Sequence, residues 1–255
     1  MNHPTFTAII PARFASTRFP GKPLAQIGGH SMVSRVYHQV KNAVNDVWVA
    51  TDDKRIYDEC ISVGANVVMT SPDHPSGTDR INEAVKLIGS KSDVIINVQG
   101  DEPFINPEQI EALKSCFDDP DTQIATLARR FDPEKGFDAL FDPNLVKVVF
   151  GEKMQALYFS RSIIPYVRGC EWKEWLEKTT FYSHVGVYAY RREVLAEVTS
   201  LPRSQHEIAE SLEQLRWLDN GYKIKVALTE HPTIGIDTPA DLEAAIKFAS
   251  ENDLL

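Results

Sequence analysis

A positively charged loop follows the first apolar run of the chain, and its residue types suit an anion. The stretch AIIPARFASTRFPGKPL places Arg13, Arg18 and Lys22 close together in one loop. Arginine offers fork-like hydrogen bonds to phosphate, lysine offers a point charge, and Gly21 lets the backbone approach an anion closely. The patterns GxxxxGK[ST] and GxGxxG are absent. The loop therefore predicts either a polyphosphate site of another kind or a solvated cationic turn.

Two acidic turns could supply ligands for a hard cation. The stretch NVQGDEP puts Asp101 and Glu102 directly after an apolar run, and GIDTPADL puts Asp237 just before a predicted helix. Mg²⁺ commonly takes one or two carboxylates together with substrate phosphates. The alternatives are a solvent-facing turn for Asp101 and Glu102, and for Asp237 an acid placed to suit the helix dipole.

Polar residues also lead into a predicted helix at SPDHPSGTDR, Ser71 to Arg80. Backbone N–H groups there could bind a ribose, a base edge or a phosphate. His74, which stands beside prolines, is either part of such a ligand loop or simply exposed.

A further set of polar side chains lies in the second half of the chain. Arg161 could pair with a carboxylate bidentately, His184 could hydrogen-bond a hydroxyl, and Glu213 and Gln214 could bind sugar hydroxyls. Taken singly, each has a structural alternative: a surface ion pair, a core histidine and a solvated helix face. Their spacing suggests no Ser–His–Asp or Cys–His arrangement.

The elements that must position these residues alternate between short apolar runs and amphipathic runs of helical length. This order predicts a mostly parallel sheet flanked by helices on both faces, whose ligands bind beyond the carboxyl ends of the strands. The expected strands are Thr7–Pro11, Val47–Thr51, Asn66–Met69 and Val94–Val98, and the expected helices are Met32–Val44, Lys54–Val63 and Thr78–Ile88.

The pattern changes after about Ala125. Strands are expected at Val146–Phe150, Ala156–Phe159 and His184–Tyr190, and helices near Glu207–Asp219 and Asp241–Ala249. Asn106-Pro107 and Thr238-Pro239 predict helix starts, and the four residues from Ser204 and from Thr238 resemble capping boxes. We therefore expect one domain over residues 1–255, with an inserted sub-lobe at about 130–190 that forms a flap or a subunit contact.

Composition narrows the classes of function. The chain has 255 residues, 27 Lys and Arg against 36 Asp and Glu, and a formal charge of −9. This balance argues against nucleic-acid binding or attachment to an anionic membrane. Three widely spaced cysteines and the lack of a long apolar run favour a reducing compartment without a membrane span, so we expect a cytoplasmic protein.

Several stretches together resemble a known family. The sequence contains IIPARFASTRFPGKPL, VATDD, MTSPDHPSGTDR, INVQGDEP, ALYFSRSIIP, HVGVYAYR, LEQLRWLDNGYKI and GIDTPADLE in this order. In order and spacing they are similar to the 3-deoxy-manno-octulosonate cytidylyltransferases, over roughly Thr7 to Lys247. The stretch Arg168–Thr180 matches no sequence pattern of this family.

The resemblance implies a nucleotide-diphospho-sugar-transferase-like fold with an antiparallel dimerisation portion from the middle of the chain. It implies a Mg²⁺-dependent enzyme and likewise a homodimer. The reaction would transfer CMP from CTP to the anomeric hydroxyl of 3-deoxy-D-manno-octulosonate (Kdo), releasing pyrophosphate, for lipopolysaccharide synthesis. The metal would lower the pKa of the sugar hydroxyl, so no protein base is nominated.

The resemblance also implies residue roles. Catalytic roles fall to Arg13, Lys22, Asp101 and Asp237, of which Asp101 and Asp237 hold the metal. The nucleotide-binding set is Arg13, Ser16, Arg18, Lys22, Arg80 and Gln99, and the sugar-acid pocket is Gln99, Arg161, His184, Tyr188, Glu213 and Gln214.

Three rival interpretations remain at this point. The protein could act on a related acid, 8-amino-Kdo or neuraminate. It could be a non-catalytic nucleotide-sugar binding protein of the same fold, although a binder needs no matched pair of metal carboxylates. A glycosyltransferase would be expected to carry a DxD-like motif, for which the comparable acids are Asp52-Asp53 and Asp101-Glu102.

Overall fold

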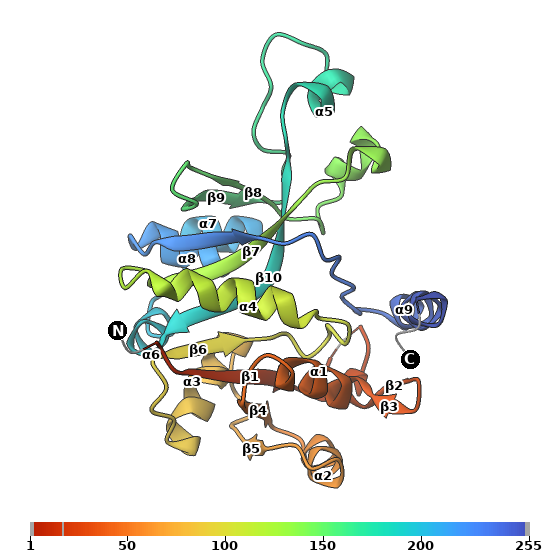
Figure 1. Cartoon of the computed structure of the whole chain (residues 1–255), viewed down its shortest axis with the longest axis vertical. Coiled ribbons are helices and arrows are strands. Elements are labelled where there is room, and N and C mark those ends of the chain that lie inside the picture. Colours follow the sequence, from red (N-terminus) through yellow and green to blue (C-terminus); the bar gives the residue numbers. More distant parts are fainter. Residues whose placement is uncertain (1–2, 17, 253–255) are drawn as a thin grey trace. The chain divides into compact units, whose positions relative to one another are not determined.

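The computed structural model describes residues 3–16 and 18–252, and these form two compact units (Figure 1). One unit combines Met1–Glu111 with Pro232–Leu255, and the other is Ala112–His231. The second unit is longer than the sub-lobe expected at 130–190, and the boundary falls inside helix α4 (Pro107–Ser115).

Four parallel strands form the centre of the first unit, in the order β6-β1-β4-β5. Most of their apolar side chains are buried; Ala8, Ile9 and Ile10 of β1 and the Val94–Ile96 run of β6 are fully so, whereas Met69 at the end of β5 is exposed. Helices α1, α2 and α3 follow in the order that the sequence predicted, and the short hairpin of β2 and β3 was not predicted. The bounds are β1 Phe6–Ala12, β2 Gln26–Ile27, β3 His30–Ser31, α1 Met32–Lys41, β4 Asp46–Thr51, α2 Lys54–Ser62, β5 Val67–Met69, α3 Gly77–Ile88 and β6 Val94–Asn97.

Helix α9 (Pro239–Glu251) returns to the first unit from the far end of the sequence. Its Ala245, with Ile236 just before it, packs in a buried cluster with Ile27 and Met32. The predicted capping box is confirmed: the Thr238 side chain caps the helix and the Asp241 side chain accepts from the Thr238 backbone.

The second unit is largely antiparallel. Strand β10 pairs with both β7 and β8, β8 pairs with β9, and only β11 runs parallel to its neighbour β7. The bounds are β7 Ile124–Arg130, β8 Lys147–Phe150, β9 Ala156–Ser160, α5 Trp175–Lys178, β10 Tyr182–Arg191, α6 Arg192–Val198, α7 Gln205–Glu210, α8 Gln214–Asp219 and β11 Ile224–Leu228. This part confirms the predicted antiparallel portion.

An aromatic cluster holds the irregular stretch that precedes β10. Trp175 packs against Phe131, Phe137 and Phe181, and in Figure 1 this segment with α5 lies beyond the ends of β8 and β9. Within the second unit, the stretch Arg168–Thr180 therefore has a packed structure even though its sequence matched no pattern.

One predicted helix is wrong. The run Glu207–Asp219 is two helices, α7 and α8, because Ser211 takes a left-handed conformation with φ of 52°. A non-glycine residue rarely adopts this conformation, so nothing in the local sequence indicates the break.

Among the residues described, no helix combines the length and the apolar character that crossing a bilayer requires.

Candidate active site

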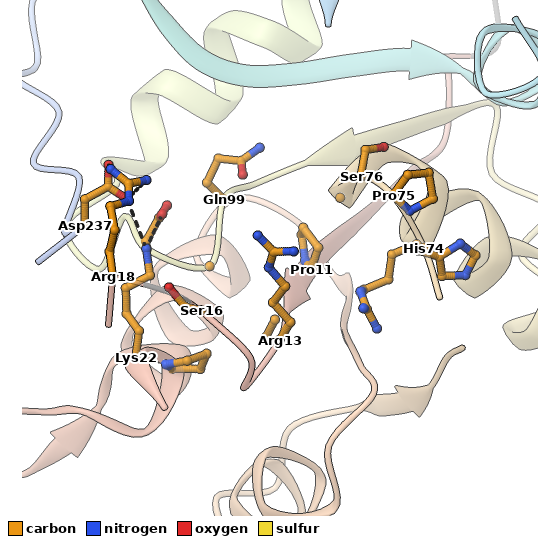
Figure 2. Close-up of a pocket in the computed structure, with 16 residues that line it drawn as sticks. Pro11, Arg13, Ser16, Arg18, Lys22, His74, Pro75, Ser76, Gln99 and Asp237 are labelled. Atoms are coloured by element: carbon orange, nitrogen blue, oxygen red, sulfur yellow. Dashed lines mark hydrogen bonds and ion pairs between the residues drawn. The ribbon is translucent and has the colours of Figure 1, made fainter. Parts of the chain in front are cut away.

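A polar cavity opens at the carboxyl ends of β1 and β6 in the first unit. Figure 2 shows Arg18, Lys22 and Asp237 gathered at one end of this cavity and Ser76, Pro75 and His74 at the other. All predicted nucleotide and metal residues line it: Arg13, Ser16, Arg18, Lys22, Arg80, Gln99, Asp101 and Asp237. The parallel-strand argument thus correctly predicted that the cationic loop and the QGDEP turn meet.

Backbone contacts shape the cationic loop. The Gly21 amide donates to the Phe14 carbonyl over 3.0 Å, and Gly21 has a φ of +72°, which favours glycine. The Phe14 ring packs beneath Gly21, where an added Cβ would lie 3.0 Å from it, and on α2 the Arg55 guanidinium lies 3.3 Å from the ring centroid. The loop is therefore closed on itself and covered by a cation–π contact.

The QGDEP turn crosses the end of β1 at unusually short range. A Cβ built on Gly100 would lie 2.7 Å from the Pro11 carbonyl oxygen. Only glycine allows this approach, which places Asp101 beside the carboxyl end of β1.

Lys22 is the centre of the charged group in this cavity. Its Nζ donates to Asp101 Oδ2 at 2.7 Å, to the Ile236 carbonyl at 2.8 Å and to Asp237 Oδ1 at 3.4 Å. Arg18 forms two parallel 3.0 Å hydrogen bonds to the same Asp237 carboxylate. The carboxylates of residues far apart in the sequence therefore face one common point.

Asp237 does not provide the side-chain hydrogen bonds at the start of α9. The carboxylate that serves the start of α9 belongs to Asp241, which accepts from the Asp237 and Thr238 amides at 3.0 and 2.8 Å. These contacts hold the pKa of Asp241 below its usual range, with the Thr238 hydroxyl the largest cause. The Asp237 side chain is thereby left to face Lys22 and Arg18.

The donor set fits a hard divalent cation that binds together with phosphate. Asp101 and Asp237 supply two carboxylates, and Mg²⁺ is usually bound by one or two carboxylates plus substrate phosphates. Within residues 3–16 and 18–252, no group of three or more His, Cys, Asp or Glu side chains is arranged to hold a metal. A metal held by Asp101 and Asp237 would therefore complete its coordination with water or with substrate phosphates.

Glu102, the neighbouring acid, does not face the charged group as a carboxylate ligand. It is buried, and desolvation, followed by the negative charge of Asp101, raises its pKa to about 8. Of the two acids in the turn, Asp101 alone is in contact with Lys22.

Arg80 on α3 lines the cavity, and two hydrogen-bond acceptors hold its guanidinium in place. Its guanidinium donates to Asp52 Oδ2 at 2.7 Å and to Thr70 Oγ1 at 2.6 Å, with side-chain exposures of 4% for Arg80 and 13% for Asp52. His74 is likewise held by Glu83, 2.6 Å away. Sequence reasoning missed Asp52 and Glu83 as partners, because only the fold brings β4, α3 and the Ser71–Arg80 loop together.

Replacing Asp52 with alanine is expected to destabilise the protein by about 3 kcal/mol, because it leaves the buried Arg80 guanidinium without its counter-charge. Urea unfolding followed by circular dichroism measures the change. Asp58→Ala, which removes an acid from the exposed pair with Lys54, is the control and should cost less than about 0.5 kcal/mol. Equal effects of the two variants would contradict this prediction.

The Asp52-Asp53 pair also bears on the glycosyltransferase interpretation. Asp52 is paired with Arg80, while Asp53 caps α2 and binds Arg55. Both acids have arginine partners, so this pair does not present a free metal motif.

The predicted sugar-acid residues divide between the units. Gln99 lines the cavity of the first unit, where its amide donates to Asn97 over 3.3 Å. The second unit contains the rest: Arg161, His184, Tyr188, Glu213 and Gln214.

His184, Tyr188 and Glu213 form one group within the second unit. The His184 and Tyr188 rings lie 5.3 Å apart between centroids. The pKa of Tyr188 is raised well above its ordinary value, mainly by desolvation and then by the charge of Glu213. Gln214 is buried beside Glu213, and among the described residues its Nε2 has no hydrogen-bond partner. A buried donor without a partner is costly, and a bound acceptor would relieve that cost.

Arg161 is anchored rather than free. Its side chain donates to the carbonyls of Glu210, Pro143 and Ser211 at 2.7, 2.8 and 3.4 Å. Arg161 could form the predicted bidentate pair with a carboxylate only through N–H groups that do not already donate to these carbonyls.

Acidification should destabilise the protein through His184. Burial lowers the pKa of this imidazole to about 3, whereas an unfolded histidine titrates near pH 6.5. Below about pH 6.5 His184 binds a proton in the unfolded state but stays neutral in the folded state. The free energy of unfolding therefore falls as the pH drops from about 6.5 toward 3.

We expect His184→Asn to reduce this pH dependence by about 2 kcal/mol between pH 7 and pH 5. Unfolding free energies from urea titrations at both pH values measure it. Phe159→Leu is the matched control, because it alters a ring 5.0 Å from His184 without removing a titrating group. A wild-type pH slope in His184→Asn would show that the histidine does not titrate in this way.

Comparison with known proteins shows the family. Residues 7–224 match a family model described as cytidylyltransferase. A 3-deoxy-manno-octulosonate cytidylyltransferase of Parabacteroides distasonis is 59% identical over 244 residues, which cover 95% of this chain and 97% of the relative. The protein of the same name from Phocaeicola vulgatus is 56% identical, with 97% and 98% covered.

Solved structures agree. The structure of CMP:2-keto-3-deoxy-manno-octonic acid synthetase complexed with CTP is 41% identical, with a TM-score of 0.89 over 97% of this chain and 99% of that chain. A putative glucose-1-phosphate thymidylyltransferase from Bacillus anthracis, only 15% identical, has a TM-score of 0.64 over 96% of this chain and 95% of its own, so it shares the fold. The predicted nucleotidyltransferase-type fold is confirmed. The chain belongs to the cytidylyltransferase family, among the 3-deoxy-manno-octulosonate cytidylyltransferases.

Proposed function

We propose that this protein transfers CMP from CTP to the anomeric hydroxyl of Kdo and releases pyrophosphate. The observation that carries the proposal is the gathering of Arg13, Arg18 and Lys22 with Asp101 and Asp237 in one cavity. Cations for a polyphosphate and a carboxylate pair for a metal are what nucleotidyl transfer needs. The near-full-length similarity to Kdo cytidylyltransferases supplies the choice of base and acceptor.

The reaction joins the sugar oxygen to the α-phosphorus of CTP and breaks the bond from that phosphorus to the oxygen that bridges the α- and β-phosphates. The hydroxyl proton is released, and the electron pair of the broken bond leaves with pyrophosphate. Such transfer depends on positioning and on stabilising negative charge. Arg13, Arg18 and Lys22 would bind the triphosphate and stabilise the charge that develops on the leaving group.

We propose Mg²⁺ as the cofactor, held by Asp101 and Asp237. When bound, it would neutralise phosphate charge and lower the pKa of the attacking hydroxyl. In the second unit, Arg161, His184, Tyr188, Glu213 and Gln214 would bind the sugar acid. Gln99 lines the cavity of the first unit and would bind the nucleotide there.

A pyrophosphate-release assay tests the proposal. The protein is incubated with CTP and Mg²⁺, with Kdo, 8-amino-Kdo or N-acetylneuraminate as acceptor, and UTP or ATP replaces CTP to test the base. We expect release with CTP and Kdo. Preference for another acid would reassign the acceptor, and no release with any acid would overturn the enzymatic proposal in favour of a binding protein.

We further propose that the protein is a cytoplasmic homodimer serving lipopolysaccharide synthesis. The second unit exposes large apolar side chains, among them Tyr166, Leu157 and Phe141 at 76%, 66% and 60%. Light scattering during size-exclusion chromatography tests the dimer, and a monomer at micromolar concentration would contradict it.

A further inference from the structure

All three N–H groups of the Lys22 ammonium have acceptors within the protein itself. An ammonium has three donors, and here the Asp101 carboxylate, the Ile236 carbonyl and the Asp237 carboxylate accept them. The side chain is mostly buried, with 15% of its surface exposed. Lys22 is thus bound where Asp101 and Asp237 converge.

The charges in this group cancel. Two carboxylates, Asp101 and Asp237, face two cations, Lys22 and Arg18, and the Arg18 contact is bidentate. A divalent cation approaching the two carboxylates alone would meet oxygens already bound by N–H groups and a positive charge at short range. Mg²⁺ also gives up its water reluctantly, so the carboxylate pair is a poor site for a free cation.

We propose that Lys22, assisted by Arg18, occupies the metal carboxylates in the nucleotide-free protein and so makes metal binding depend on bound nucleotide. The inference rests on the proposed function of this cavity. It adds a second role for the two cations, as competitors of the metal before the triphosphate is bound.

A triphosphate offers these cations another anion. Arg18 has 64% of its side-chain surface exposed, so it can turn from Asp237 toward a ligand. Arg13, also in the cavity, makes no side-chain hydrogen bond or ion pair within the described part of the chain, so it is available to the first phosphate that arrives. A phosphate that attracts Lys22 frees the Asp101 carboxylate for a metal. By linkage, a metal bound to Asp101 then raises the affinity for nucleotide by the same factor as nucleotide raises the affinity for the metal.

The competing view is that Lys22 simply ties the Ile236–Asp237 segment to the QGDEP turn. That segment already has a backbone tie, from the Ile236 amide to the Asp101 carbonyl at 3.0 Å. A purely structural Lys22 predicts that its removal weakens or leaves unchanged the binding of a metal, whereas the competition predicts tighter binding.

Mn²⁺ binding to the nucleotide-free, full-length protein separates these views. The free Mn²⁺ signal in electron paramagnetic resonance gives the dissociation constant without any turnover. We expect Lys22→Gln to bind Mn²⁺ at least about tenfold more tightly than the wild type, a typical size for coupling between sites. Arg18→Gln should give a smaller gain.

Two controls define the site. Lys54→Gln removes a lysine from an exposed pair with Asp58 and should leave Mn²⁺ affinity unchanged, which excludes an effect of net charge alone. The double variant Lys22→Gln with Asp101→Asn should lose the gain, which assigns it to the carboxylate pair.

Unchanged or weaker Mn²⁺ binding by Lys22→Gln would overturn the inference. If that variant does not fold, as judged by circular dichroism, Arg18→Gln decides, because its exposed side chain is not part of the core; no gain there would equally overturn it. Wild-type pyrophosphate release together with a failed Mn²⁺ result would reject only this inference. Absent release with every acid would reject the proposed function itself.

Discussion

Replacing Asp101 with asparagine is expected to lower turnover at least about 100-fold while the protein stays folded. Loss of outer partners of a metal ligand already costs 10–100-fold, and Asn retains the shape of Asp but not its charge. The loss should be greatest at limiting Mg²⁺. Pyrophosphate release at varied Mg²⁺ measures turnover, and circular dichroism measures folding.

The Asp101 assignment has a clear control in Asp58→Asn, which removes an exposed charge paired with Lys54. That variant should keep wild-type turnover. Near wild-type activity of Asp101→Asn at limiting Mg²⁺ would mean that Asp101 is not a metal ligand.

Replacing Lys22 with alanine should reduce kcat/KM for CTP by roughly 10²–10³-fold, the range seen when one stabilising donor is removed from a developing charge. The step affected is the one that depends on the triphosphate, so the kinetic constants for the acceptor should change less. The variant also leaves the Asp101 and Asp237 carboxylates facing each other without the cation between them. Initial rates at varied CTP and fixed Kdo give the constants.

Lys54→Ala is the matched variant for Lys22, since it removes a lysine outside the cavity. Its rates should equal those of the wild type. Unchanged CTP kinetics in Lys22→Ala, with the control behaving as expected, would remove the triphosphate role from the cationic loop.

The first unit was predictable from sequence because its strands are short apolar runs buried on both faces. The strands predicted at Thr7–Pro11 and Val47–Thr51 lie within one residue of β1 and β4 at each end. Helix starts were confirmed where side chains cap them. The Glu108 backbone amide donates to Asn106 Oδ1 at 2.9 Å, and the capping box that begins at Ser204 is present.

The second unit was less predictable because long-range pairing decides it. Strands β7 and β11 were not predicted, although they pair with each other, and β11 joins only after a separation of about a hundred residues, as in Ile224 opposite Ile124. Local composition carries no trace of that pairing. The same holds for the left-handed Ser211, which divides α7 from α8.

In the cavity, the sequence predicted which charges would meet but not how they would pair. The ends of parallel strands share one edge, so the meeting of Lys22 with Asp101 followed from the elements. The support of Arg80 by Asp52 did not follow, because it depends on a side-chain direction across β4 and α3. The function assigned to each residue remains a prediction.

The first unit is made from two stretches of chain that are far apart, and this has a consequence for biosynthesis. Asp237 follows Asp101 by 237 − 101 = 136 residues. At about 5–20 residues per second, the ribosome adds Asp237 roughly 7 to 27 s after Asp101.

During that interval the nascent first unit has the cationic loop and Asp101 but lacks Ile236, Asp237 and α9. The apolar surface of Ile27 and Met32, which α9 later covers, is meanwhile open. The growing chain can therefore neither bring Asp237 to Asp101 nor cover this part of its core until the segment with Ile236, Asp237 and α9 is synthesised. A ribosome stalled before that segment would hold an intermediate with exposed apolar surface.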